Sequence, residues 1–225
     1  MRLDLHIHSR YSYDSMMSPK LILKFAELRS LNVISVTDHE TMEIYRKEFK
    51  PDNLRKLNER NFFVIPGMEV RTEMGDVTGL FLNHEIKSRS FFEVLDEIRV
   101  QDGLAILSHP YRRKQDPENI IDHFDLIEVL NGRCRKNENR KASIISDKYD
   151  KPYITGSDAH MWWEIGNVYT KIVSHRDDKI EIDDMEELRN ILLNKDKTIK
   201  GMVLPFYLTH GFSFLIGKLR KGGLS

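Results

Sequence analysis

Histidine and carboxylate side chains follow one short apolar run after another along this chain. The series comprises His6, His8, Asp14, His39, Glu69, Asp76, His109, Asp158 and His160. One such residue would mean little, but a set of nitrogen and oxygen donors at successive strand ends is what a multinuclear metal site needs. Donors of this kind, without thiolates, suit Zn, Mn or Fe better than a soft metal, and their spacing does not separate these three. The pattern favours a metal-dependent hydrolase.

The first candidates lie in or just after predicted strands near the start of the chain. His6 and His8 are two residues apart, so both side chains face one side of a strand and can chelate a single metal. The same pair also fits two half-exposed polar residues, and Asp14 fits an ordinary turn. His39 follows the buried-type run VISVTD, where it or Asp38 could cap the next helix. Asp38 could instead orient a metal-binding histidine from behind.

The later candidates repeat this placement. Glu69 follows VIPG, which we interpret as a strand ended by a turn, and its two oxygens could bridge two cations. A carboxylate there is costly unless it is paired or metal-bound. His109 follows the strand LAIL, while Asp158 and His160 flank one residue and could face the same way. Gly156 leaves room for the backbone to approach the site closely.

The elements that must position these residues alternate between strands and helices. Strands are predicted at 3–8, 33–37, 62–65, 77–82, 104–107, 126–130 and 153–155, with an edge strand at 168–173. Helices are predicted after Ser18-Pro19, after a capping box at 90–93, and after Asp183 or Asp184. Alternation of this kind predicts a parallel sheet, and about seven repeats of the unit predict a closed α/β barrel. Active sites of such barrels lie at the carboxyl ends of the strands.

Composition narrows the class of protein. The length of 225 residues fits one domain, and equal counts of 35 basic and 35 acidic residues disfavour a general nucleic-acid coat. The single cysteine, Cys134, excludes an internal disulfide. The polar start MRLDLHIHS is unlike a signal peptide, and no stretch reaches the ~20 apolar residues that span a bilayer. These features predict a cytoplasmic protein.

Five segments in order carry a family resemblance: HIHSRYSYDS, TDHET, PGMEV, SHPYR and GSDAH. Together they resemble the polymerase-and-histidinol-phosphatase (PHP) domain, in its stand-alone phosphoesterase group, over about residues 1–175. The resemblance implies a distorted (β/α)7 barrel that holds two or three divalent metal ions. Residues 1–200 are accordingly predicted as the PHP domain. Residues 201–225 are predicted as an amphipathic extension that packs on the barrel or on a partner, including a second copy of the chain.

The resemblance also implies three groups of ligands. The first metal would be held by His6, His8, Glu69 and Asp158. Glu69 would bridge to a second metal, shared with His109 and a residue of the next strand. The third would be held by Asp14, His39 and His160. Many family members have a histidine where the best alignment here gives Asp76, and His84 ranks second for that position. The other histidines, His123, His175 and His210, are assigned to surface or helix roles together with His84.

The implied reaction is hydrolysis of a small phosphorylated substrate by a metal-activated hydroxide. Glu69, Asp158 and His160 are the candidate catalytic residues. The candidates for holding the substrate share guanidinium or amide donors near the strand ends: Arg10, Arg112, Asn131 and Arg133. Two alternatives remain, namely an enzyme that processes nucleic-acid ends and a metal-binding regulatory module without catalysis.

Overall fold

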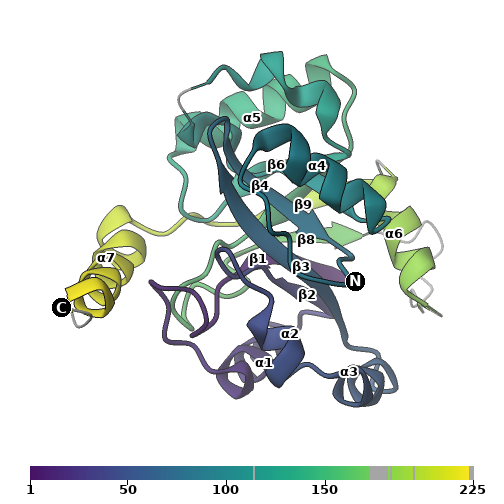
Figure 1. The fold of residues 1–225 in the computed structure, drawn as a ribbon, viewed down its shortest axis with the longest axis vertical. Coiled ribbons are helices and arrows are strands. Elements are labelled where there is room, and N and C mark those ends of the chain that lie inside the picture. Colours follow the sequence, from purple (N-terminus) through teal and green to yellow (C-terminus); the bar gives the residue numbers. More distant parts are fainter. Residues whose placement is uncertain (114, 173–181, 183, 195, 223–225) are drawn as a thin grey trace.

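A single mixed sheet forms the centre of the molecule in the computed structural model (Figure 1). The structure describes residues 1–113, 115–172, 182, 184–194 and 196–222. Within these ranges the sheet has nine strands in the order β7-β6-β5-β4-β3-β2-β1-β8-β9. The strands are β1 (Arg2–Ile7), β2 (Val33–Val36), β3 (Phe63–Thr72), β4 (Gly75–Leu80), β5 (Leu104–Leu107), β6 (Leu126–Asn131), β7 (Tyr153–Gly156), β8 (Val168–Ile172) and β9 (Lys197–Gly201).

Helices lie around this sheet. They are α1 (Pro19–Leu28), α2 (Glu43–Lys47), α3 (Pro51–Asn58), α4 (Phe91–Val100), α5 (Lys136–Lys148), α6 (Met185–Leu193) and α7 (Phe206–Gly222). The Ser18 hydroxyl caps α1 as expected, and the Asp184 carboxylate caps α6. The predicted capping box of α4 is wrong, because Ser90 makes no side-chain cap and the Glu73 carboxylate accepts the Phe91 N–H instead.

The strands curve into a distorted barrel, which confirms the predicted fold. β1, β2 and β3 pair in parallel, as do β5, β6 and β7. The seam is closed by a parallel bridge between Ile7 and Ala159, which follows β7. β8 then runs antiparallel to β1 and pairs with β9 on its other side. β8 is therefore not an edge strand, and β9 was not predicted.

The middle of the barrel departs from a regular alternation of strands and helices. β4 runs antiparallel to both β3 and β5 and follows β3 as a hairpin without a helix between them. β3 also continues well past the predicted turn at Pro66-Gly67. Pro66 pairs with Val36, the last residue of β2, and β3 pairs with β4 from Gly67 onward. A Cβ at Gly67 would lie 2.7 Å from Ser35 Oγ, so only glycine fits at this crossing.

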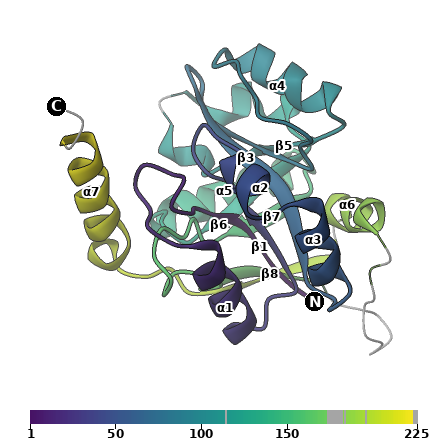
Figure 2. The ribbon, with the colours of Figure 1, turned by 60° about the horizontal axis from the view of Figure 1, so that its bottom comes forward.

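Apolar side chains on both sides of the sheet form the core, and residues of β1, β3 and α4 are among the largest that are fully buried. Helix α7 stands beside the barrel on the side where the parallel strands end (Figure 2). Two arginines connect it to the barrel: Arg133 donates to Thr209 O and Ser213 Oγ, and Arg220 donates to Ser12 O. Among the described residues, no helix is both long and apolar enough to cross a membrane.

Candidate metal centre

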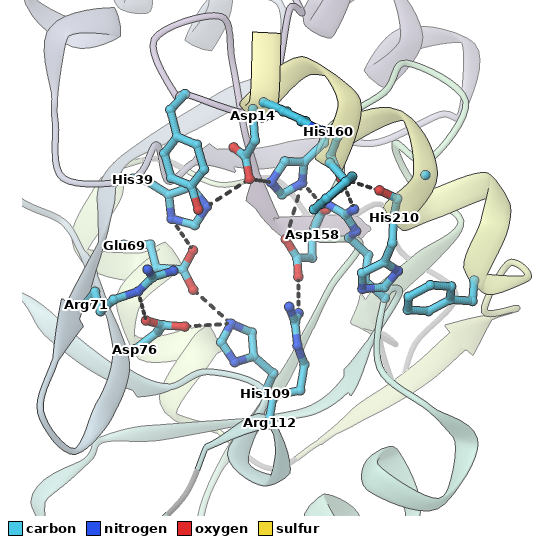
Figure 3. Close-up of a pocket in the computed structure, with 18 residues that line it drawn as sticks. Asp14, His39, Glu69, Arg71, Asp76, His109, Arg112, Asp158, His160 and His210 are labelled. Atoms are coloured by element: carbon cyan, nitrogen blue, oxygen red, sulfur yellow. Dashed lines mark hydrogen bonds and ion pairs between the residues drawn. The ribbon is translucent and has the colours of Figure 1, made fainter. Parts of the chain in front are cut away.

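The predicted ligands converge on one rim of the barrel, and Figure 3 shows all of them except His6 and His8. Parallel strands end there, so His6 and His8 of the β1 end, His109 after β5 and Asp158 after β7 meet at the same edge. Glu69 reaches this edge from within the long β3 strand, and its backbone is bridged to His39. Asp76 reaches it from the other direction, because it lies near the start of the antiparallel strand β4.

Glu69 lies at the centre of the cluster and is 1% exposed. Its Oε1 lies 2.9 Å from His109 Nε2, while its Oε2 lies 3.4 Å from both His6 Nε2 and His8 Nε2. His39 Nδ1 is 3.1 Å from the same Oε2. The two oxygens of one carboxylate thus face different histidines. This is the arrangement that a bridging ligand between two cations requires.

Three groups of donors overlap around Glu69 among the described residues. Within each group the ligand atoms lie within 4.8 Å of one another: His6, His8 and Asp158; His6, Glu69 and His109; and His8, His39 and His160. Asp14 adjoins the last group, with Oδ2 at 3.0 Å from His160 Nε2 and 3.6 Å from His39 Nε2. Donors that share one metal at ~2.1 Å are themselves about 3 Å apart, so these spacings suit coordination.

The Nε2 atoms of His6 and His8 give an independent test of fit. Both are buried and have no hydrogen-bond partner. His8 Nδ1 lies 3.1 Å from Ser12 Oγ, whose own hydrogen goes to Asp38, so Nδ1 carries the proton. His6 Nδ1 likewise lies 3.0 Å from Glu128 Oε1. In the neutral imidazole each Nε2 therefore has a lone pair aimed into the cluster, and a bound metal ion would take the place of a proton there.

Electrostatics point the same way. Burial, reinforced by His160 and His39, lowers the pKa of His8 to about 3 and keeps it neutral. Burial opposes ionisation of Glu69 and Asp158, but His6 and other cationic neighbours hold the pKa of both carboxyls well below its usual range. Burial also opposes protonation of His6, yet Glu69, Glu128 and Asp158 outweigh it and raise its pKa. The cluster therefore concentrates negative charge where cations are favoured.

Backbone geometry shows that the site is held in place by its surroundings. His109 and Asp158 both have positive φ, at 30° and 53°, in the left-handed region that non-glycine residues seldom adopt. The His109 N–H donates to Glu128 Oε2 at 2.8 Å, which helps to hold this conformation. Gly156 confirms the predicted close approach, because a Cβ there would overlap the Cβ of His6 and the carboxylate of Glu128.

Comparisons with known proteins identify the chain. A family model described as PHP-associated matches residues 136–194. The uncharacterized protein MJ0417 of Methanocaldococcus jannaschii is 34% identical over 214 residues, which cover 89% of this chain and 83% of the relative. A two-domain protein of Bacteroides vulgatus that contains a predicted PHP-like metal-dependent phosphoesterase superposes with a TM-score of 0.69 at 17% identity. The chain belongs to the PHP family.

The solved structures that resemble this chain share its fold at low sequence identity. The superposition covers 89% of this PHP chain but 64% of the Bacteroides protein, so this chain spans about two thirds of that structure. An amidohydrolase of Chromobacterium violaceum, solved with bound sulfate and no metal, superposes with a TM-score of 0.58 at 16% identity, over 70% of this chain and 87% of the other. At such identities the likeness concerns the fold alone.

The candidate substrate-binding residues of this PHP protein lie in different surroundings. Arg112 lines the pocket and its Nη1 donates to Asp158 Oδ2 at 2.9 Å. Arg133 also lines the pocket but is 8% exposed and holds α7. Asn131 is fully buried and donates to Glu128 and Asp158. Arg10 is not among the pocket residues, and its guanidinium pairs with Glu48, so the structure does not bring it together with the other candidates.

Sequence reasoning missed several residues of the site. Glu128 was read only as part of a strand, although a lone acid within the apolar run LIEVL is a signal that it has a buried partner. Arg71 lines the pocket and its Nε lies 3.5 Å from Asp76 Oδ1. His210 was assigned to a surface or helix role, yet it lines the pocket from α7. His175 lies outside the described residues.

Asp76 is the departure from the PHP pattern, and its role stays a prediction. Its Oδ2 lies 3.9 Å from His109 Nε2, and it lies outside the three donor groups found among the described residues. His84 is exposed beyond the far end of β4, where its N–H donates to Gln101. We expect Asp76→Ala to weaken metal binding and Asp76→His to retain it, because imidazole suits the same metals.

Metal titration of the three variants checks this expectation, with His84→Ala as the matched control that should bind like the wild type. A loss of metal in His84→Ala together with normal binding in Asp76→Ala would reverse the assignment.

Proposed function

We propose that this PHP protein is a metal-dependent phosphoesterase that hydrolyses a small phosphorylated substrate, with two or three Mn, Zn or Fe ions as cofactors. The observation that carries the proposal is the position of Glu69, whose two oxygens face separate histidines of overlapping donor groups. His6, His8, Glu69 and Asp158 would hold the first ion, Glu69 with His109 and Asp76 the second, and Asp14, His39 and His160 the third. Such ions, when bound, polarise a phosphoryl oxygen and lower the pKa of water toward neutrality.

The residues around the cluster orient its donors and hold the substrate. Asp158 faces His8 through Oδ1 at 3.3 Å, and its Oδ2 accepts hydrogen bonds from Arg112 and Asn131. One carboxylate thereby places the Arg112 guanidinium next to the metal site. A guanidinium has five N–H donors, so Arg112 can keep this bond and also bind a phosphate oxygen in the pocket.

His160 is positioned from the same strand end. Its Nδ1 lies 2.8 Å from Asp158 O, so that nitrogen donates to the carbonyl and directs Nε2 toward Asp14. The backbone N–H of His160 donates to the Glu164 carboxylate at 2.8 Å. Glu69, Asp158 and His160 are therefore the residues that we propose to organise the reacting groups, in agreement with their candidate catalytic role.

The surroundings of the pocket favour a small substrate over a nucleic-acid strand. The cavity has a volume of about 1000 Å³ and is lined by residues of α7 as well as of the barrel. One of its arginines, Arg133, is buried and binds α7, so it is not available to a strand of phosphates. A nucleic-acid strand would bind best along a continuous row of available basic side chains. These contacts therefore favour a small substrate.

A panel of substrates tests the proposal. Phosphomonoesters, phosphodiesters, an oligonucleotide and simple amides would be incubated with the protein, with Mn and Zn added separately. We expect phosphoester hydrolysis that chelation abolishes. Turnover confined to the oligonucleotide would favour the nuclease alternative, and turnover confined to amides would overturn phosphoester chemistry. A metal-loaded protein that hydrolyses none of them would be a regulatory module.

A further inference from the structure

Helix α7 contributes a regular row of side chains to the pocket, although it lies outside the motifs that define the metal centre. Phe206, His210, Phe214 and Lys218 follow one another at intervals of four residues, and all four line the same cavity as the metal ligands. Residues four apart lie on one face of a helix. We call these four residues the α7 row. His210 is seen in Figure 3 beside Asp158 and His160.

A neighbouring face of α7 fixes the orientation of this row. The buried Arg133 guanidinium donates hydrogen bonds to Thr209 O and Ser213 Oγ. Because Arg133 follows β6, these bonds join α7 to the barrel. About two helical turns beyond Ser213, Arg220 donates to Ser12 O at 2.6 Å and to Arg10 O at 3.1 Å. The helix is therefore attached to the barrel near both of its ends. The α7 row faces the cavity because the adjacent face is used for these contacts.

The side chains of the α7 row differ in polarity from those of the metal centre across the cavity. The metal centre presents carboxylates and imidazoles, whereas the row presents two phenyl rings. Phe206 is 67% exposed and Phe214 is 75% exposed. The ring of His210 stacks on Phe206 with centroids 4.2 Å apart and an angle of 9° between the planes. Apolar rings exposed within a cavity are surfaces that a ligand can cover, because their burial is favourable.

His210 adds one directional group to this apolar wall. Its Nδ1 lies 2.8 Å from Thr209 Oγ1, whose hydroxyl donates to Phe206 O. A hydroxyl has one hydrogen, so Thr209 accepts from the His210 Nδ1–H. In the neutral imidazole, Nε2 is then left as a hydrogen-bond acceptor. Lys218 ends the row with a positive charge, which suits an anionic ester.

We propose that the α7 row determines substrate specificity by binding the leaving group, and that this group is large and planar or apolar rather than a small polyol. The inference rests on the proposed function, because the metal centre would hold the phosphate. The cavity of about 1000 Å³ is far larger than a phosphate group, so it leaves room for the rest of the substrate beside the α7 row.

A pair of phenylalanine variants tests the row. Phe214→Ala removes a ring that lines the cavity, and Phe212→Ala removes a ring of the same helix that is 47% exposed and is not among the cavity residues. Hydrolysis of 2-naphthyl phosphate and of glycerol 2-phosphate would be compared with Mn or Zn present. We expect Phe214→Ala to lower kcat/KM for the naphthyl ester about tenfold, mainly through KM, as the loss of one aromatic contact implies. Glycerol phosphate turnover should be unchanged, and Phe212→Ala should behave like the wild type.

Calorimetric binding of 2-naphthylmethylphosphonate separates this inference from the proposed function. Weaker binding to Phe214→Ala but not to Phe212→Ala would support the row even if neither ester were hydrolysed, in which case the phosphoesterase proposal fails. Hydrolysis of both esters by the wild type, with equal constants for the two variants, would overturn the row and leave the phosphoesterase proposal standing. Equal losses on both esters in Phe214→Ala would also overturn it, since a specificity residue must distinguish them.

Discussion

Glu69→Gln is expected to lose most of its bound metal and at least about 100-fold in turnover while remaining folded. Even groups that only orient metal ligands typically contribute 10–100-fold, and Glu69 is proposed to bind the ions themselves. Its Oε1 and Oε2 lie within 3.4 Å of four histidine nitrogens. An amide has the same shape but no negative charge, so it cannot hold two cations together. Metal analysis, steady-state kinetics and circular dichroism of the purified variant measure the three expected outcomes.

Two further glutamate variants make the result specific. Glu27→Gln is the matched control, because its side chain is 77% exposed and distant from the cluster, and it should be indistinguishable from the wild type. Glu128→Gln should give an intermediate loss, since Glu128 contacts His6 Nδ1 and is not one of the residues proposed to bind the ions. Near-normal turnover and metal content in Glu69→Gln would show that Glu69 is only a buried carboxylate among histidines.

Gly156→Ala is expected to damage both stability and the metal centre. The added methyl group would overlap the Cβ of His6, which is fixed in β1, and the carboxylate of Glu128. Overpacking of a core typically costs about 1–3 kcal/mol in unfolding free energy. We expect a cost at the upper end here, because the Cβ of His6 follows its backbone and the Glu128 carboxylate is held by hydrogen bonds, so neither neighbour can move away easily. For a chain of this size, ~3 kcal/mol corresponds to a decrease in Tm of about 6–12 °C.

Thermal unfolding, monitored with and without added metal, measures this effect. Gly211→Ala is the control, because a Cβ at Gly211 of α7 would meet no atom within 4 Å. Alanine is also the better helix former, so that variant should be at least as stable as the wild type. An unchanged Tm and normal metal content in Gly156→Ala would mean that the backbone does not approach His6 as closely as the structure shows.

The barrel and its rim were accessible from the sequence because short buried strands carry a simple signal. The run LAIL is apolar and His109 follows shortly after it, while His6 and His8 mark the end of the run that begins with LDL. The hairpin of β3 and β4 was not accessible in the same way. Pro66-Gly67 is typical of a turn, but here it marks the point where β3 changes partner from β2 to β4. That change depends on neighbouring strands, which local sequence does not specify.

The sequence predicted only those residues of the candidate site that lie in recognisable motifs. The candidate ligands were found because histidine and aspartate are conspicuous at strand ends. Glu128 was missed because its role depends on contact with His6, which is far away in the sequence. The α7 row was missed because its spacing in the sequence gives the shared helix face but not the cavity that the face lines. Both depend on tertiary contacts, which spacing alone does not reveal.

The central claim is that the donors around Glu69 hold metal ions that the reaction requires. Metal analysis of the purified protein by mass spectrometry, combined with an activity assay before and after chelation, tests it most directly. We predict two or three equivalents of Mn, Zn or Fe per chain, loss of activity with chelator, and recovery when metal is returned. Less than one equivalent, with activity that chelator does not change, would contradict the claim.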